Sequence, residues 1–485
     1  AGIDGVAQVI AQFEGAYLPM ALWESTVLPL RVPDYRPAML DELIASGEVL
    51  WAASTVGEEH LVAFFPTDSP LAPLPIDEAS GVAASLVPEP GEESRGGKVP
   101  TGEGRANHAA REAGPMAVTG GEGSQDCADL APVAAVVRQV LVAQGPVTFC
   151  ALVDETVRRM EPAVPAQGEV AEALQGLVWA GAATNDGLGF PRAGGLAVPS
   201  AAAPSVGQQP PSSRRRASSR RGRSLRSEMR AQARATVVAR QGAALAFDAA
   251  LAGRWSALAP TAQSSTVQAV ALVESLLDRY GVVTRDIALA AGVPGGLSSL
   301  YPVLRAMEDA GELIRGMFVE SMGPAQFAAR ETVEVLRGFA DAATASEGGG
   351  AAGRPLSLAV LPADDPVCLL GAGIPWPEVM WTAAGSAPAV EATLVAAKPS
   401  RREGALVVLA DGAPVLWAAP RLKSLLAFTT DEAVLAAATE ALVAFVAASL
   451  KRDGSAAMRR KIIVTYFNGR DVLDTPAALW LQRAG

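Results

Sequence analysis

A helix that runs into glycine and then into a β-prone segment occurs three times in this chain. The three copies are IASGEVLWAAST (44–55), LVWAGAATND (177–186) and MEDAGELIRGMFVE (307–320). Glycine is favoured just past a helix C-terminus because it adopts the left-handed conformation without a Cβ penalty. Recurrence of one such unit predicts a row of similar modules instead of a single large core.

The second copy shows most clearly what each module contains. Residues 132–145 predict a helix that stops at Gly145, and 147–160 predict a second helix with Thr148 as its N-cap. A third helix within 168–186 stops at Gly181, and LGFPR (188–192) is expected to follow a turn as part of a hairpin. Three helices and then a hairpin are the order of a winged-helix domain.

The third copy predicts the same order, and the first copy shows the same ending. Residues 266–281 and 282–292 give two helices, and 295–321 a third helix with a wing strand. Near the start of the chain, 5–15 predict a helix, and 36–55 a helix, Gly47 and a strand, whose returning partner is 60–66. We therefore expect three winged-helix domains.

The last part of the chain has a different pattern. Apolar β-prone runs occupy 356–362, 405–419 and 461–469, with Asp411-Gly412 as a hairpin turn and a long helix at about 431–450. These segments predict an α+β terminal domain that is β-rich and barrel-like. The whole chain is therefore expected to be α+β, with tandem winged helices followed by this domain.

Two segments lack apolar periodicity and separate the modules. Residues 76–126 mix Gly, Glu, Ser and Pro, and 194–245 form a flexible, Arg-rich linker. The resulting domain boundaries, in chain order, are these: winged helix 1–75, disordered linker 76–126, winged helix 127–193, Arg-rich linker 194–245, winged helix 246–345 and β-rich domain 355–485.

Charge and rare residues exclude several classes of function. The three cysteines are isolated, and the two histidines, His60 and His108, have no ligand-spaced carboxylates, so neither a disulfide framework nor a metal site is predicted. Glu440 interrupts the most apolar stretch, 433–450, and we expect a cytoplasmic protein with no membrane partner. Although the net charge is −11, residues 214–240 hold ten arginines and one acid. Local patches of this kind decide nucleic-acid contact.

Several long segments resemble the C-terminal region of Lhr, the large helicase-related protein family of bacteria. They include LPMALWESTVLPLRVPDYRPAMLDELIASGEVLWAAS (18–54), LQGLVWAGAATND (174–186) and LLDRYGVVTRDIALAAGVPGGLSSLYPVLRAMEDAGELIRGMFVESMGPAQFA (276–328). Similar stretches are DDPVCLLGAGIPWP (364–377) and REGALVVLADGAPVLWA (402–418). The resemblance covers nearly all the predicted folded segments, in order.

The resemblance implies a DNA-repair setting. Members of the family are ATP-dependent 3′-to-5′ DNA helicases whose C-terminal extension is similar to HTH_42-type DNA glycosylases and is thought to promote oligomerisation. This chain contains no GxxxxGK[ST] loop, and RGGKVPTGEG (95–104) has the wrong spacing. No cofactor is expected here, and ATP and Mg²⁺ are expected only for a helicase core elsewhere in the same polypeptide.

Two groups of residues are predicted to contact DNA. In the linker, arginines would contact phosphates without sequence preference, although the run could equally be a solvated tether. In the third winged helix, the start of the third helix and the wing are positions often presented to DNA, although many winged helices contact only proteins. The candidates are Arg214, Arg215, Arg216, Arg220, Arg221 and Arg223 in the linker, and Ser298, Ser299, Tyr301 and Arg315 in the third winged helix.

Base excision is the alternative function, and it needs a carboxylate beside a pocket for the flipped base. The resemblance associates uracil-DNA glycosylase activity with part of the family. Asp364, Asp365 and Asp474 are candidates, and each could instead be a turn or capping aspartate. Trp51, Trp179, Trp376 and Trp417 lie among apolar neighbours and are predicted to be core residues instead of base-stacking ones. The prediction is thus a DNA-binding and oligomerisation region of an Lhr-type helicase, with a glycosylase module as the alternative.

Overall fold

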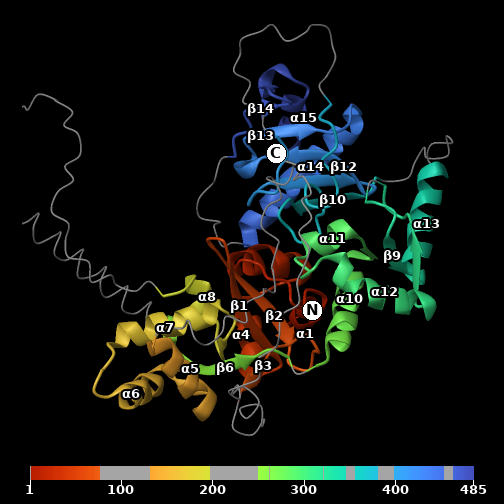
Figure 1. Cartoon of the computed structure of the whole chain (residues 1–485). Helices are drawn as coiled ribbons and strands as arrows, with labels where there is room; N and C mark the ends of the chain where they lie inside the picture. The colour runs from red at the N-terminus through yellow and green to blue at the C-terminus, as the bar shows by residue number, and fades with distance from the viewer. Residues whose placement is uncertain are drawn as a thin grey trace, which may run out of the picture. The chain divides into compact units, whose positions relative to one another are not determined.

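The computed structural model describes eight segments, which fall into two compact units. The segments are 2–76, 132–196, 249–261, 263–320, 322–345, 356–380, 398–452 and 462–485. The described residues up to Ser264 belong to the first unit, and those from Ser265 onward to the second. Figure 1 colours these segments from red to blue, and each unit is described separately.

The first winged helix is built around a two-stranded wing. Helix α1 (Ile3–Gln12) and helix α4 (Pro37–Ser46) pack on the hairpin of β1 (Val49–Val56) and β2 (Glu59–Pro66). As predicted, α4 ends at Gly47 in the left-handed conformation, with φ of 78°. Trp51 and Phe64 pair across the hairpin and are fully buried.

The middle helical stretch of this module was not predicted from the sequence. It comprises α2 (Met20–Leu22), the π-helical turn η1 (Trp23–Val27) and α3 (Leu28–Arg31). Pro29 cannot donate a backbone hydrogen bond, and the chain widens into the π turn just before it. Proline at both 19 and 29 hid the helical periodicity.

The predicted helices of the second winged helix are confirmed. They are α5 (Pro132–Gln144), α6 (Phe149–Met160) and α7 (Gln167–Trp179). The hydroxyl of Thr148, in strand β4 (Val147–Thr148), caps α6 by accepting a hydrogen bond from the Ala151 amide. The helices pack through apolar residues that include Val137, Leu152 and Leu174, each fully buried.

The predicted hairpin of the second module was wrong. Strand β5 (Ala183–Asn185) is followed by the short helix α8 (Gly189–Ala193), which contains most of the LGFPR segment. The antiparallel partner of β5 is instead β6 (Arg254–Ala259), which lies far along the chain and was expected to belong to the third winged helix. A local periodicity cannot reveal a partner at that separation.

Strand β6 is the centre of the sheet in the first unit. Along one edge it pairs with β5, and along the other with both β4 and β3 (Leu74–Ile76). Trp255 to Ala259 are all buried. Residues of the first and second modules therefore share one sheet, and Figure 1 shows β6 beside β3 and α5.

A small set of polar contacts also joins the two modules of the first unit. The Trp51 indole donates to the carbonyls of Asn185 at 2.9 Å and Gly187 at 3.2 Å. In return, the Thr184 hydroxyl donates to the Trp51 carbonyl at 2.7 Å. His60 stacks on Trp179 with ring centroids 4.1 Å apart. The tandem winged helices of this unit are thus packed together instead of being loosely linked.

The second unit begins with the predicted third copy of the winged helix. Its helices are α10 (Ser265–Tyr280), α11 (Arg285–Ala290) and α12 (Leu297–Asp309), and its strands are β7 (Val282–Val283), β8 (Leu313–Gly316) and β9 (Gln326–Ala329). The strand order is β7-β9-β8. Helix α13 (Arg330–Ala345) follows β9, and the Thr284 hydroxyl caps α11 by accepting from the Ile287 amide.

The rest of the second unit contains a six-stranded sheet. Its strands run in chain order as β10 (Leu358–Pro362), β11 (Leu406–Ala410), β12 (Ala413–Ala418), β13 (Ser424–Ala427), β14 (Tyr466–Phe467) and β15 (Arg470–Asp471). The predicted Asp411-Gly412 turn is confirmed, with positive φ at both residues. Within the described segments the sheet runs from β10 to β15 without closing, so the expected barrel is not confirmed.

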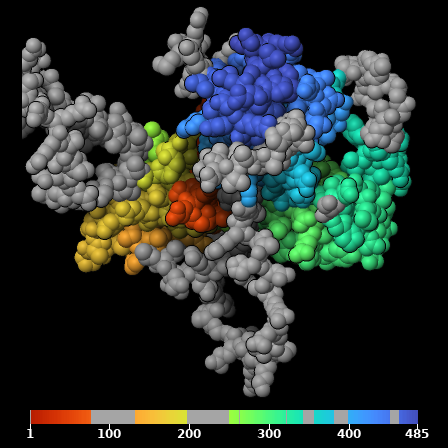
Figure 2. All heavy atoms as spheres, turned by 90° about the horizontal axis from the view of Figure 1, so that it is seen from above, coloured from red at the N-terminus to blue at the C-terminus, as the bar shows by residue number. Residues whose placement is uncertain are grey.

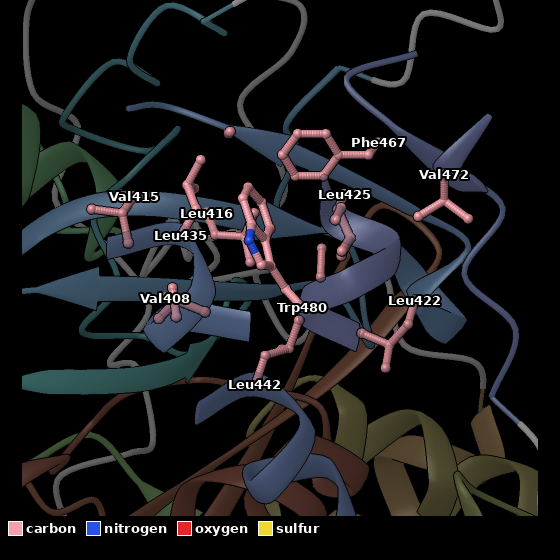
Figure 3. Packing of buried hydrophobic residues seen from close by; sticks show 14 of the residues in the cluster. Val408, Val415, Leu416, Leu422, Leu425, Leu435, Leu442, Phe467, Val472 and Trp480 are labelled. Carbon is pink, nitrogen blue, oxygen red and sulfur yellow. The ribbon is translucent and has the colours of Figure 1, made fainter. Parts of the chain in front are cut away.

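Alternating side chains give this sheet two apolar faces. One face packs against α14 (Glu432–Arg452) and α15 (Ala477–Ala484), and Figure 3 shows Trp480 directed toward Phe467 and Leu425. On the other face, Trp417 and Leu426 pack against residues of the 363–379 segment. By length and composition α14 could also cross a membrane, but Leu435, Ala438 and Leu442 on it are buried in the domain core.

Trp51 and Thr184 generate a prediction about the first unit. Trp51→Phe removes the indole donor from the Asn185 and Gly187 carbonyls, and Thr184→Val removes the hydroxyl donor from the Trp51 carbonyl. Each should lower the free energy of unfolding by about 1–3 kcal/mol, measured by urea denaturation followed by circular dichroism. Glu59→Gln changes an exposed side chain on the partner strand β2 and should change the free energy of unfolding by less than about 0.5 kcal/mol. Equal effects of all three would show that the modules are not joined here.

Candidate nucleic-acid interface

The third helix of the module in the second unit, α12, carries three of the predicted DNA-facing residues, and Arg315 lies on strand β8. Gly295 and Gly296, both with positive φ, turn the chain into the helix. Leu297, Leu300 and Leu304 face the core. The opposite side of the helix is exposed at Ser298, Pro302 and Arg305. The surface of this module is green in Figure 2.

The two predicted serines differ in their surroundings. Ser298 is exposed on the outer side of α12. The Ser299 hydroxyl lies 2.6 Å from the Pro294 carbonyl oxygen and 2.9 Å from that of Gly296, and it can donate to either. Both serines are exposed, but only the Ser299 hydroxyl bonds to the backbone at the start of the helix, whereas the structure gives Ser298 no such role.

The predicted Tyr301 and Arg315 contact each other. Tyr301 is partly buried, with its ring edge-on to Phe327 at 6.0 Å between centroids. Arg315 on β8 donates from Nη1 to the Tyr301 hydroxyl at 3.3 Å, and its Nε lies 3.5 Å from a carboxylate oxygen of Glu308. The structure thus brings three side chains together between helix and wing, one of them an acid that was not predicted from the sequence.

In the first unit, the corresponding third helices are poorly suited to phosphate. Neither α4 nor α7 contains lysine or arginine, and both expose acids, among them Glu42, Glu169 and Glu172. Helix α4 is also engaged within the unit, because Arg192 of α8 lies 2.7 Å from the Asp41 carboxylate and 2.8 Å from that of Glu24. Of the three described third helices, only α12 carries an arginine.

The six predicted arginines of the basic run lie outside the described residues, so their prediction is untested. The described residues on either side show which unit the segment is attached to. The chain leaves the first unit after Leu196, which is buried, and returns to the same unit at Ala249, just before β6. The Arg-rich segment therefore begins and ends on one unit, whereas the sequence pattern indicated a linker between two domains.

Asp364 and Asp365 lie directly after β10, in a loop that Arg401 supports. Asp365 is buried, and its side chain accepts from the Val367 amide at 3.0 Å. The Arg401 guanidinium donates to the carbonyls of Cys368 and Asp365. Gly371, with φ of 76°, lies against the Trp376 indole, so the loop is tight. Asp365 and Arg401 thus serve the fold of this loop.

Asp364 has different surroundings and is only partly buried. Burial raises its pKa from 3.8 to about 6, the nearby charges of Asp365 and Glu403 act in the same direction, and its own backbone amide and Arg401 oppose them. A carboxyl group with this pKa exchanges protons near neutral pH, as an acid–base catalyst must. Asp474 lies far along the chain in an exposed 3-10 turn, η6 (Val472–Asp474).

Three of the four predicted core tryptophans are buried: Trp51, Trp179 and Trp417. Trp376 is partly buried and packs against the apolar cluster of the terminal sheet, where it stacks on Phe428 with centroids 6.4 Å apart. Arg305 and Arg401 were not predicted from the sequence. The periodicity of α12 could have identified Arg305, since Ser298, Pro302 and Arg305 follow one side of a helix. No sequence signal identifies Arg401, which donates hydrogen bonds to a loop over thirty residues away.

Comparison with known proteins gives two kinds of match. The winged-helix domain of the large helicase-related protein, Lhr, matches residues 1–67 and 262–348. The Lhr helicase/uracil glycosylase of Escherichia coli is 32% identical over 485 residues, which are all of this chain and 26% of that protein. The Lhr helicase/probable uracil glycosylase of Mycolicibacterium smegmatis is 33% identical over 476 residues, 98% of this chain and 25% of that protein.

The fold and these matches define the class of protein. The chain is a tandem winged-helix protein with an additional sheet-containing region. It belongs to the Lhr family and spans about a quarter of the length of the relatives that it matches, corresponding to their C-terminal region.

The raised pKa of Asp364 predicts a pH-dependent contribution to stability. Because folding disfavours the charged carboxylate, its cost is present above pH 6 and disappears as pH falls toward 3.8. Asp364→Asn should therefore raise the melting temperature at pH 8 and raise it less at pH 5, in thermal denaturation followed by circular dichroism. Asp474→Asn, which removes an exposed carboxylate, is the control. A gain for Asp364→Asn that is larger at pH 5 than at pH 8 would contradict the assignment.

Proposed function

We propose that this chain is a DNA-binding region that works beside the helicase core of an Lhr-type DNA-repair protein. The observation that carries the proposal is the outer side of α12, where Ser298 and Arg305 are exposed on the third helix of a winged-helix domain. Third helices of helix-turn-helix proteins enter the major groove, and arginine and hydroxyl side chains contact phosphates. ATP and Mg²⁺ would belong to the helicase core.

The Arg-rich segment is proposed to supply a second, sequence-independent contact. Ten arginines within 214–240 would neutralise phosphates and release counterions. The segment is attached at both ends to the first unit, whose described third helices are acidic. In this proposal the first unit contributes the basic segment, and the second unit contributes the winged-helix face.

Self-association belongs to the same proposal. Exposed apolar side chains support it, notably Val335 and Phe339, which lie four residues apart on α13 and are 57% and 69% exposed. Apolar groups on one side of a helix are a common element of subunit interfaces. Light scattering should give a mass above that of one chain, and a single-chain mass at micromolar concentration would contradict this part.

Base excision is the second candidate function, and Asp364 is the observation that favours it. Both relatives are named as uracil or probable uracil glycosylases. A glycosylase uses a carboxyl group to position water or to stabilise the cationic sugar, and Asp364 has a pKa near neutrality and is partly accessible. Asp365 is engaged in loop structure, and Asp474 is exposed in a turn.

The arginine contacts can be tested by replacing six of them together. With Arg214, Arg215, Arg216, Arg220, Arg221 and Arg223 changed to Gln, affinity should fall to a similar degree for every duplex sequence. The slope of log affinity against log salt should flatten by about 0.9 for each phosphate that is no longer neutralised. Fluorescence anisotropy across a salt series measures both quantities. Full affinity with an unchanged slope would identify the run as a solvated tether.

Base excision can be tested by a single-turnover assay on uracil-containing DNA with alkaline cleavage of abasic sites. If Asp364 takes part, Asp364→Asn should reduce the rate at least tenfold, about 1.4 kcal/mol in activation free energy, while DNA affinity is retained. Asp474→Asn should keep the wild-type rate. Absence of product with stoichiometric wild-type protein would leave only the binding function.

A further inference from the structure

The outer side of α12 contains one arginine that was not predicted from the sequence. Arg305 lies two turns after Ser298 on the same side of the helix and is exposed. Residues seven positions apart on a helix lie nearly in line. Ser298, Pro302 and Arg305 therefore form one solvent-facing row, which a phosphate backbone crossing the helix could contact.

Arg315 already contacts other side chains of its own domain. Its guanidinium contacts the Tyr301 hydroxyl through Nη1, and its Nε lies 3.5 Å from Glu308. Glu308 is itself only 26% exposed in its side chain, which shields the pair partly from solvent. Arg315, whose own side chain is 44% exposed, thus has a carboxylate beside it that competes with an approaching phosphate.

The position of Glu308 makes the competition direct. It lies three residues after Arg305 on α12, and it reaches across to the β8 strand of the wing. A carboxylate at this junction both occupies Arg315 and repels phosphate, since like charges close together are unfavourable. The same pair also ties the wing to the third helix.

We propose that Arg305 is the phosphate-contacting cation of this winged helix and that Glu308 limits DNA affinity by holding Arg315 in an intramolecular pair. The inference rests on the proposed DNA-binding function. Under this proposal Arg305 contacts DNA directly, whereas Arg315 becomes available to DNA only when its pair with Glu308 is broken.

The test measures duplex DNA affinity of the full 485-residue chain by anisotropy between 50 and 200 mM salt. Arg305→Gln should weaken binding and flatten the log–log slope by about 0.9, so that the fall in affinity across that range is about 3.5-fold smaller. Arg305→Lys should retain most of the affinity. Arg337→Gln, which removes an exposed arginine from α13, should leave affinity and slope unchanged.

Glu308→Gln should strengthen binding and steepen the slope by about 0.9, because Arg315 becomes available. The double variant Glu308→Gln with Arg315→Gln should return the slope to the wild-type value, and Glu334→Gln on α13 should have no effect. Circular dichroism spectra should match the wild type throughout.

Two outcomes would overturn the inference while the wild type still binds. An unchanged slope in Arg305→Gln would remove Arg305 from the interface. Unchanged or weaker DNA binding by folded Glu308→Gln would show that the pair with Glu308 does not keep Arg315 from binding DNA. If the wild-type chain fails to bind DNA even at 50 mM salt, the proposed function itself is wrong.

Discussion

The first unit depends on a strand that lies far from its partners in the sequence. Strand β6 pairs with β5 along one edge and with β3 and β4 along the other, and five of its six residues are buried. Without it, β5 has no partner among the described strands, and the backbone groups of three short strands would need other hydrogen-bond partners. One strand therefore completes the second winged helix and joins it to the first.

This connection also affects which of the third helices can bind DNA. Because the first unit packs its modules against each other, Asp41 of α4 is paired with Arg192, and Trp179 at the end of α7 is covered by His60. These third helices serve contacts within the unit. Their exposed positions carry acids, whereas the corresponding helix of the second unit, α12, exposes an arginine on its outer side. Winged helices of one chain can thus differ in role even though they share a fold.

Local signals in the sequence predicted most of the helices and the apolar runs that contain β10, β11, β12 and β14. Gly47, Gly145 and Gly181 end helices as expected, because positive φ at a helix terminus is a local requirement that glycine satisfies. The π-helical turn near Pro29 and the role of β6 could not be predicted in this way. Pro19 and Pro29 interrupt the helical pattern around the π-helical turn, and the role of β6 depends on strand pairing between segments that are distant in the sequence.

The same distinction applies to the candidate sites. Position on a helix was sufficient to select Ser298 and Tyr301, but not to show that Arg315 is paired with Glu308 or that Ser299 shapes the helix start. Likewise, Asp364 and Asp365 are adjacent in sequence, and only the structure separates a buried loop residue from a partly accessible group with a raised pKa. Side-chain partners across elements decide which polar residues remain available to a ligand.

Hydrogen–deuterium exchange of the whole chain, with and without a DNA duplex, tests the central claim most directly. We predict that DNA slows exchange within 297–316, at the third helix and wing of the second unit, and leaves α4 and α7 unchanged. Slower exchange at α4 or α7, with 297–316 unaffected, would contradict this assignment of the DNA-binding face.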